Sequence, residues 1–121
     1  MLTINKVFPE KTIPEKTDSF LFFDIETTGF SRDNTILYLI GCGYFAEEGF
    51  QFIQWFNDDG TSEEEILLAF QNILVKKDWQ LVTFNGNSFD IPYLKRHYDL
   101  NELTCDIEKY PSLDFYQFLK P

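Results

Sequence analysis

Histidine, cysteine and basic residues are scarce in this sequence of 121 residues, which has one His, two Cys and ten Lys or Arg. Cys42 and Cys105 show no CxxC or Cys/His spacing, so we predict reduced, partly buried thiols. The longest apolar run, residues 36–45, is far shorter than the ~18 residues of a membrane span and contains two glycines. The first 16 residues lack the pattern of a signal peptide. These absences predict one soluble globular domain in the cytoplasm.

The charge is strongly acidic, with twenty Asp or Glu and a net charge of −10. Such a balance argues against a free-standing nucleic-acid binder, because phosphate binding normally needs a basic face. Two explanations would still allow a nucleic-acid substrate. Either clustered acids hold divalent cations that reverse the local field, or basic segments lie outside this chain.

The apolar patterns predict an α/β fold, a mixed sheet flanked by helices. Short β-rich runs separated by turn residues predict strands at residues 19–26, 35–45, 49–56, 80–84 and 111–113. Helical spacing predicts helices at residues 61–76, 90–98 and 114–119, the first of them capped by Thr61 or Ser62. The short connection at Glu47 and Glu48 permits only a reversal, so the first three strands form an antiparallel meander. The helix after them allows strand 80–84 to run parallel to the first strand.

Asp24 and Glu26 are the acids that carry the most information. Strand residues two apart point to the same face, so both carboxylates emerge together from an apolar strand. Two adjacent carboxylates repel, and a divalent cation between them is the economical remedy. Oxygen-only ligation points to Mg²⁺ or Mn²⁺. The alternative is that both acids simply face solvent at a strand end.

Asp90 lies at a predicted strand-to-helix junction. The carboxyl ends of neighbouring parallel strands meet at one edge of a sheet, which would bring Asp90 close to Asp24 and Glu26. An acid in the first turn of a helix is also favoured by the helix dipole. This structural role and metal ligation are compatible.

Two segments carry a resemblance to a known family. The run FFDIETTG at residues 22–29 resembles the first exonuclease motif of the DEDD superfamily, and FNGNSFDIPYL at residues 84–94 resembles its second. Within that superfamily the sequence is most similar to YprB-type ribonuclease H-like domains. The motifs stand in the right order, separated by a predicted meander and helix.

The resemblance implies a metal-dependent 3′–5′ exonuclease that hydrolyses phosphodiester bonds. In that family two Mg²⁺ or Mn²⁺ ions lie between the carboxylates and a nucleic-acid phosphate. Asp24, Glu26 and Asp90 would then be catalytic metal ligands, and Thr27 and Asn85 would contact the terminal nucleotide. The implied partner is the 3′ end of single-stranded DNA or RNA.

The sequence departs from the family at its third motif, an Asp on a late helix, which would lie tens of residues beyond Asp114. Asp106 and Asp114 are poor substitutes, and Asp114 is most simply a helix N-cap. We therefore expect an N-terminal extension at residues 1–18 and a C-terminally incomplete exonuclease domain at residues 19–121. This short form is expected to bind metal weakly and to be nearly inactive. An additional C-terminal or partner domain would supply the missing acid and a basic surface.

Two other functions stay open. A catalytically inactive nucleic-acid-binding or interaction domain would explain the missing acid and the acidic charge. A haloacid dehalogenase-type phosphatase would use a similar strand-end Asp, but it needs a parallel sheet. Of the weaker signals, His97 is expected to be solvated or stabilised by a helix dipole, and Lys95, Arg96 and Tyr98 are candidates for phosphate contacts.

Overall fold

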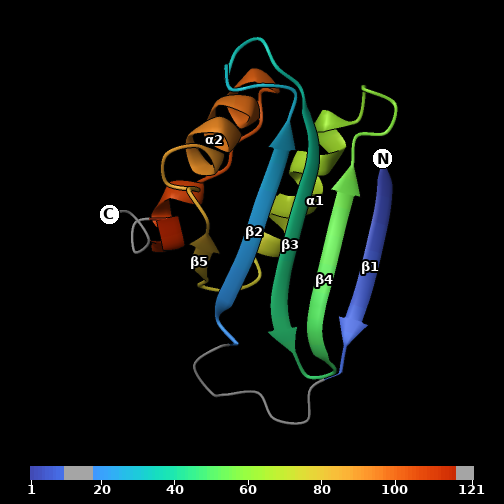
Figure 1. Ribbon diagram of the computed structural model, residues 1–121, viewed down its shortest axis with the longest axis vertical. Coiled ribbons are helices and arrows are strands. Elements are labelled where there is room, and N and C mark those ends of the chain that lie inside the picture. The colour runs from blue at the N-terminus through green and yellow to red at the C-terminus, as the bar shows by residue number, and fades with distance from the viewer. Residues whose placement is uncertain (10–17, 117–121) are drawn as a thin grey trace.

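The protein is a mixed β-sheet with two α-helices, described by a computed structural model at residues 1–9 and 18–116 (Figure 1). The strands are β1 (Leu2–Phe8), β2 (Phe20–Thr27), β3 (Leu37–Ala46), β4 (Gly49–Phe56), β5 (Gln80–Thr83) and β6 (Ser112–Asp114). The helices are α1 (Glu63–Leu74) and α2 (Asp90–Leu100), with a 3₁₀ helix, η1, at Ile107–Lys109. Within the described ranges, no helix has the length and apolar character needed to cross a membrane.

The strand order β1-β4-β3-β2-β5-β6 joins an antiparallel half to a parallel half. β1, β4, β3 and β2 pair antiparallel in that order, whereas β5 pairs parallel with β2 and with β6. Only Glu47 and Glu48 separate β3 from β4, so the chain must reverse there, and Gly49 supports the turn with a φ of 130°. The predicted α/β fold, with its meander and parallel strands, is confirmed.

The two faces of β2 have different surroundings. Leu21, Phe23 and Ile25 are at most 5 % exposed and pack in the core with buried residues of both helices. Strand side chains alternate between faces, so Phe22, Asp24 and Glu26 point to the opposite face. Phe22 is half-buried there, and the two acids are exposed. The acids thus lie on the face of β2 that the helical core does not cover.

β1 was not expected from the sequence, which assigned the first 18 residues to an extension. It pairs with β4 along its whole length, from Leu2 opposite Phe56 to Phe8 opposite Phe50. It is an edge strand in which Ile4 alone is half-buried and the other residues are exposed. Its apolar and polar residues alternate only from Leu2 to Asn5 before Lys6 interrupts the pattern, which is too short a signal for a strand to be predicted.

The start of α1 also differs in detail from the expectation. Ser62 is the N-cap residue as predicted, but its side chain makes no capping hydrogen bond. The Ser62 hydroxyl instead donates to Asp59 Oδ1 at 2.7 Å and accepts from the Met1 ammonium group at 3.0 Å. The helix ends at Leu74, two residues before the predicted end. Of the helix expected at residues 114–119, Asp114 instead ends β6, residues 115 and 116 are helical, and residues 117–119 lie outside the described residues.

Candidate active site

Asp24 and Glu26 occupy the end of β2 where its regular pairing breaks. The register between β2 and β3 shifts between Glu26 and Thr27, so the ladder becomes irregular beside the acids. Burial of its carboxyl group raises the pKa of Asp24, and the negative charge of Glu26 raises it further. Hydrogen bonds from the Ile25 N–H and with Asp90 offset only part of this. Asp24 therefore lies in a site that disfavours its charged form.

Asp90 is the first residue of α2 and is only 4 % exposed. β5 pairs with β2 only from Phe20 to Phe22, so the first turn of α2 lies beside the later part of β2. There Asp90 Oδ2 accepts the N–H of Ile25 at 3.3 Å. Burial, followed by the charges of Asp24 and Asp114, raises the pKa of Asp90 to about 7.

The carboxyl groups of Asp24 and Asp90 lie close enough for the charge of Asp24 to raise the pKa of Asp90. Two neighbouring carboxyl groups are stabilised when one of them holds a proton that both can share. A pair of this kind titrates as a unit, and a divalent cation can replace the proton between the oxygens. These oxygen donors fit Mg²⁺ or Mn²⁺, which prefer carboxylate and water ligands.

The sequence placed Asp24, Glu26 and Asp90 together, and the structure brings Asp24 into contact with Asp90. Glu26 is near enough for its charge to act on Asp24. Across residues 1–9 and 18–116, no three Asp, Glu, His or Cys side chains are spaced closely enough to hold a metal ion as they stand. The assignment of all three acids as ligands therefore stays a prediction.

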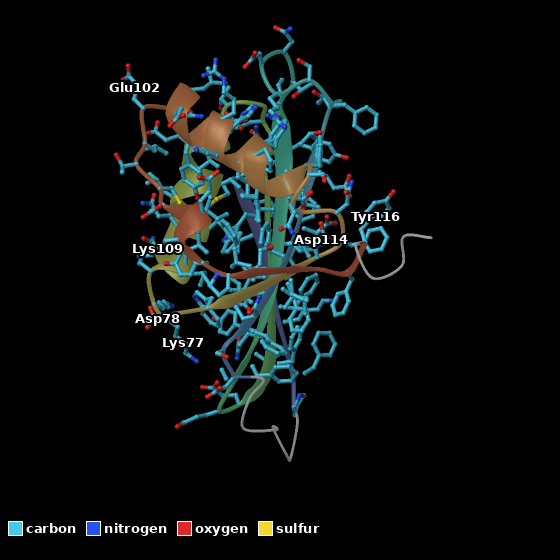
Figure 2. All side chains as sticks on the ribbon, turned by 90° about the vertical axis from the view of Figure 1, so that its left-hand side faces the viewer. Lys77, Asp78, Glu102, Lys109, Asp114 and Tyr116 are labelled. Atoms are coloured by element: carbon cyan, nitrogen blue, oxygen red, sulfur yellow. The ribbon has the colours of Figure 1, made fainter. Side chains whose placement is uncertain are left out.

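Asp114, at the end of β6, is a further buried acid next to the site. It is 2 % exposed, and its oxygens accept the N–H groups of Asn85 at 2.6 Å, Asn87 at 3.2 Å and Tyr116 at 3.0 Å. The last of these is the hydrogen bond that an N-cap makes. Asp114 and Tyr116 lie on one side of the molecule, away from Glu102 and Lys109 (Figure 2). Sequence reasoning recognised the cap but missed that Asp114 also holds the turn before Asp90.

That turn, at residues 85–88, has a backbone that few residue types allow. Asn85 has a φ of 65°, in the left-handed region where Asn is tolerated. A Cβ atom on Gly86 would lie 2.3 Å from Thr83 Oγ1, which accepts the Gly86 N–H at 3.1 Å. The AsnGly sequence thus lets β5 turn sharply into α2 and sets Asp90 against β2.

Thr27 and Asn85, the predicted nucleotide contacts, flank the acids in sequence and belong to different segments. The Thr27 hydroxyl donates to the carbonyl oxygen of Gly29 at 2.6 Å, in the loop that follows β2. Asn85 lies in the turn after β5 and donates its backbone N–H to Asp114. Both residues are half-buried. Their contact with a nucleotide stays a prediction.

The structure gives partners to the residues behind two weaker signals. Lys95 forms an exposed ion pair with Glu108 at 3.1 Å and Arg96 one with Asp33 at 2.6 Å, and their contact with phosphates stays a prediction. His97 is not solvated, because it is only 2 % exposed and both of its ring nitrogens have hydrogen-bond partners. The sequence showed only that His97 follows two basic residues, and burial is a consequence of how α2 packs.

A groove on the open face of the sheet adjoins Asp24. It has a volume of about 540 Å³ and is lined by Asp24 together with apolar side chains of several strands. These include Phe22, Leu39, Phe50, Phe52 and Val82. Gly43 permits part of this surface, since a Cβ atom there would lie 2.3 Å from the ring of Phe50. Asp24 thus borders a large apolar surface.

Comparison with known proteins places this fold in a family. A family model described as the RNase H superfamily matches residues 21–121, which is most of the chain. The chain belongs to the RNase H superfamily. The mixed sheet described above is an RNase H-like α/β fold. Membership supports a nuclease-type function in general terms.

Individual relatives are DNA polymerases. The chain is 35% identical over 86 residues to a DNA polymerase of Pyrococcus glycovorans and 33% identical over 91 residues to one of Desulfurococcus sp. (strain Tok). These matches cover 61% and 66% of the chain but only 11% of each polymerase. The family B DNA polymerase of Pyrobaculum calidifontis has a similar fold, with a TM-score of 0.65 at 15% identity over 83% of this chain and 16% of the polymerase. The chain thus corresponds to a small part of these larger proteins.

Proposed function

We propose that this RNase H superfamily chain carries the site of a metal-dependent 3′–5′ exonuclease that hydrolyses phosphodiester bonds. The observation that carries the proposal is the contact between Asp24 and Asp90, both of which have a raised pKa. The charges that raise these pKa values are carboxylates, namely Glu26 for Asp24, and Asp24 and Asp114 for Asp90. A cluster of this kind is typical of a site that gains a cation. The YprB-type assignment within the superfamily stays part of this proposal.

In the proposed site Asp24, Glu26 and Asp90 hold Mg²⁺ or Mn²⁺. When bound, two such ions supply a hydroxide nucleophile and stabilise the negative charge of the transition state. The chain's own residues set the geometry around them. The Ile25 N–H orients Asp90 Oδ2, and Asp24 and Asp90 would hold the cation in their ionised forms. Thr27 and Asn85 are proposed to contact the terminal nucleotide at the 3′ end of single-stranded DNA or RNA.

The fourth acid of the site is proposed to come from outside the described residues. Asp114 is unsuited to this role, because its oxygens already accept three backbone N–H groups. The net charge of −10 and the ion pairs of Lys95 and Arg96 leave little positive charge for phosphates. We therefore propose that a C-terminal or partner segment supplies both an acid and a basic surface. The apolar groove beside Asp24 offers it a place to pack.

The domain division is proposed in the same form as the sequence indicated. Residues 19–121 are proposed to form the nuclease domain, and residues 1–18 an N-terminal extension. Within the extension, β1 adds a strand to the edge of the sheet. Cytoplasmic localisation also stays a prediction.

A second candidate is a catalytically inactive nucleic-acid-binding or interaction domain. The acidic charge of the chain and the departure from the family's third motif favour it. The phosphatase alternative is not favoured, because β2 pairs antiparallel with β3 whereas that enzyme class needs a parallel sheet. Nuclease activity and metal binding separate the first two candidates.

The test is digestion of labelled single-stranded DNA and RNA with Mn²⁺ by this chain and by a version extended past Pro121. We expect near silence from the short form and digestion from the 3′ end by the extended form. Asp24→Asn should abolish that activity. Asp78→Asn, which removes an exposed acid between α1 and β5, is the matched control and should leave it intact.

Two outcomes would contradict parts of the proposal. Robust digestion by the short form, lost in Asp24→Asn, would show that another acid of these 121 residues completes the site. Silence from the extended form, together with unchanged binding of labelled DNA in Asp24→Asn, would favour the binding-domain candidate.

A further inference from the structure

The loop between β2 and β3 follows the acids of β2 directly, and α2 holds it. Three α2 side chains each contact a different residue of the loop. Tyr93 Oη lies 2.9 Å from Thr35 Oγ1, Arg96 Nε lies 2.6 Å from Asp33 Oδ1, and His97 Nε2 lies 2.8 Å from the carbonyl oxygen of Arg32. The helix that begins at Asp90 therefore also anchors the loop that leaves Asp24 and Glu26.

His97 is the buried member of this set. It is 2 % exposed and stacks on the ring of Tyr93, with 4.1 Å between ring centroids and an angle of 11° between the planes. Its second nitrogen, Nδ1, lies 2.8 Å from Oε1 of Glu63 at the start of α1. One imidazole ring thus connects α2, α1 and the loop.

The partners of His97 determine where its protons lie. A main-chain carbonyl oxygen can only accept, so Nε2 must donate to Arg32. Glu63 Oε1 also accepts the N–H of Leu37 at 3.1 Å, and Oε2 accepts the side-chain amide of Asn101 at 2.8 Å. Burial raises the pKa of Glu63, but the hydrogen bonds from His97, Asn101 and Leu37 outweigh it and leave the pKa below its usual value. An ionised Glu63 can only accept, so Nδ1 must donate as well.

We propose that His97 is a buried imidazolium that, together with Glu63, positions the loop of residues 28–36 beside the carboxylates. It is a positioning residue, since it touches none of the acids proposed to hold metal. Its value for catalysis rests on the proposed function, whereas its charge and its hold on the loop do not. The pair neutralises itself, and Glu63 gains further stabilisation at the N-terminal end of α1.

The charged and titratable groups around His97 are consistent with one buried cation. Glu63 faces the ring from α1, and Asn101 from the end of α2 is neutral. Tyr93, stacked on the ring, has a pKa raised by burial and stays a neutral phenol at pH 7. Arg96 and Asp33 on the neighbouring surface form their own ion pair. Glu63 is thus the one carboxylate in contact with the ring among these groups.

The chain's single histidine makes the test direct, because ¹⁵N spectra of the imidazole ring contain one set of signals. In the metal-free wild-type chain at pH 7 we expect both ring nitrogens to carry protons. Glu63→Gln should convert the ring to the neutral form, with one bare nitrogen. Glu64→Gln is the matched control, because it removes the same charge from an exposed neighbour in the same helical turn and should preserve the imidazolium.

Amide hydrogen exchange tests the hold on the loop. The Ile36 N–H donates to Thr28 Oγ1 at 2.9 Å, and the Thr28 N–H donates to the Ile36 carbonyl at 3.0 Å. Both amides should exchange about tenfold faster in Glu63→Gln than in Glu64→Gln, because a lost charge-assisted hydrogen bond favours local opening. Apart from Leu37, whose N–H donates to Glu63 itself, amides of α1 and β3 should change little, which distinguishes local release from general unfolding.

Either of two results would overturn the proposal. One is a neutral His97 ring in the wild-type chain at pH 7, and the other is equal exchange of the Thr28 and Ile36 amides in the two variants. These measurements use neither metal nor nucleic acid. A chain without nuclease activity would therefore leave the proposal about His97 standing, and a neutral His97 would leave the proposed nuclease standing.

Discussion

Asp90 and Asp114 are two aspartates at almost the same depth, 4 % and 2 % exposed, and their surroundings are opposite. Asp114 accepts three backbone N–H groups, whereas Asp90 accepts one, at 3.3 Å, and faces another carboxyl group. Hydrogen bonds to the charged form favour ionisation, and burial or a nearby like charge opposes it. Burial alone therefore does not show what an acid does. Asp114 stabilises the fold through its hydrogen bonds, whereas Asp90 is buried in surroundings that disfavour its charged form.

The largest expected effect is a pH dependence that Asp90 adds to stability. The pKa of Asp90 is about 7 in the folded chain against a model value of 3.8, so the folded state holds the proton more tightly. The stabilisation is complete below about pH 4 and is lost as the pH rises through 7. This difference amounts to on the order of 4 kcal/mol between pH 4 and pH 8.

Urea unfolding of the metal-free chain at both pH values measures the effect. Asp90→Asn should remove most of the decline and should be more stable than the wild type at pH 8. A variant that declines with pH as steeply as the wild type would contradict the contrast between Asp90 and Asp114.

Asp114→Ala should lower the free energy of unfolding at every pH near neutrality, whereas Asp90→Asn should raise it at pH 8. It leaves the N–H groups of Asn85, Asn87 and Tyr116 without their acceptor, at a cost of about 3 kcal/mol. The free energy of urea unfolding is the measurement, with the exposed Asp78→Ala as control. A loss no greater than in the control would mean that Asp114 does not hold the turn before Asp90.

Mn²⁺ should bind at Asp24 and Asp90 and should not need Asp114. A cation that binds Asp24 and Asp90 in the folded chain only should stabilise it by ~1.4 kcal/mol at ten times its dissociation constant. The thermal midpoint of the wild type at pH 7 should therefore rise with Mn²⁺, and that of Asp24→Asn should not. Asp114→Asn should retain the response, and loss of the response in that variant would identify Asp114 as a metal ligand.

The smallest expected effect belongs to Glu26. Its charge raises the pKa of Asp24, so Glu26→Gln should lower that pKa toward its ordinary value. Carboxyl ¹³C signals of Asp24, followed during a pH titration, provide the measurement. An unchanged titration would show that Glu26 points away from Asp24 in solution.

Much of the fold could be predicted because its signals are local. The two-residue connection at Glu47 and Glu48 dictates a reversal, and α1 provides the length needed for a parallel crossover. The spacing of Asp24 and Glu26 placed both acids on one face of β2. β1 was not predicted, because the apolar alternation of this exposed edge strand is short and interrupted. Its backbone nevertheless pairs with β4 along its whole length.

The sequence by itself determined the mixed sheet, the face of β2 that bears the acids and the family to which they belong, because strand alternation and turn chemistry depend on near neighbours. Only the tertiary structure decided which polar groups meet. Asp24 and Asp90, His97 and Glu63, and Asp114 and Asn85 are 29 to 66 residues apart in the chain. The pKa values of Asp24, Asp90 and Glu63 depend on burial and on partners that the fold brings together, and no local pattern in the sequence records either.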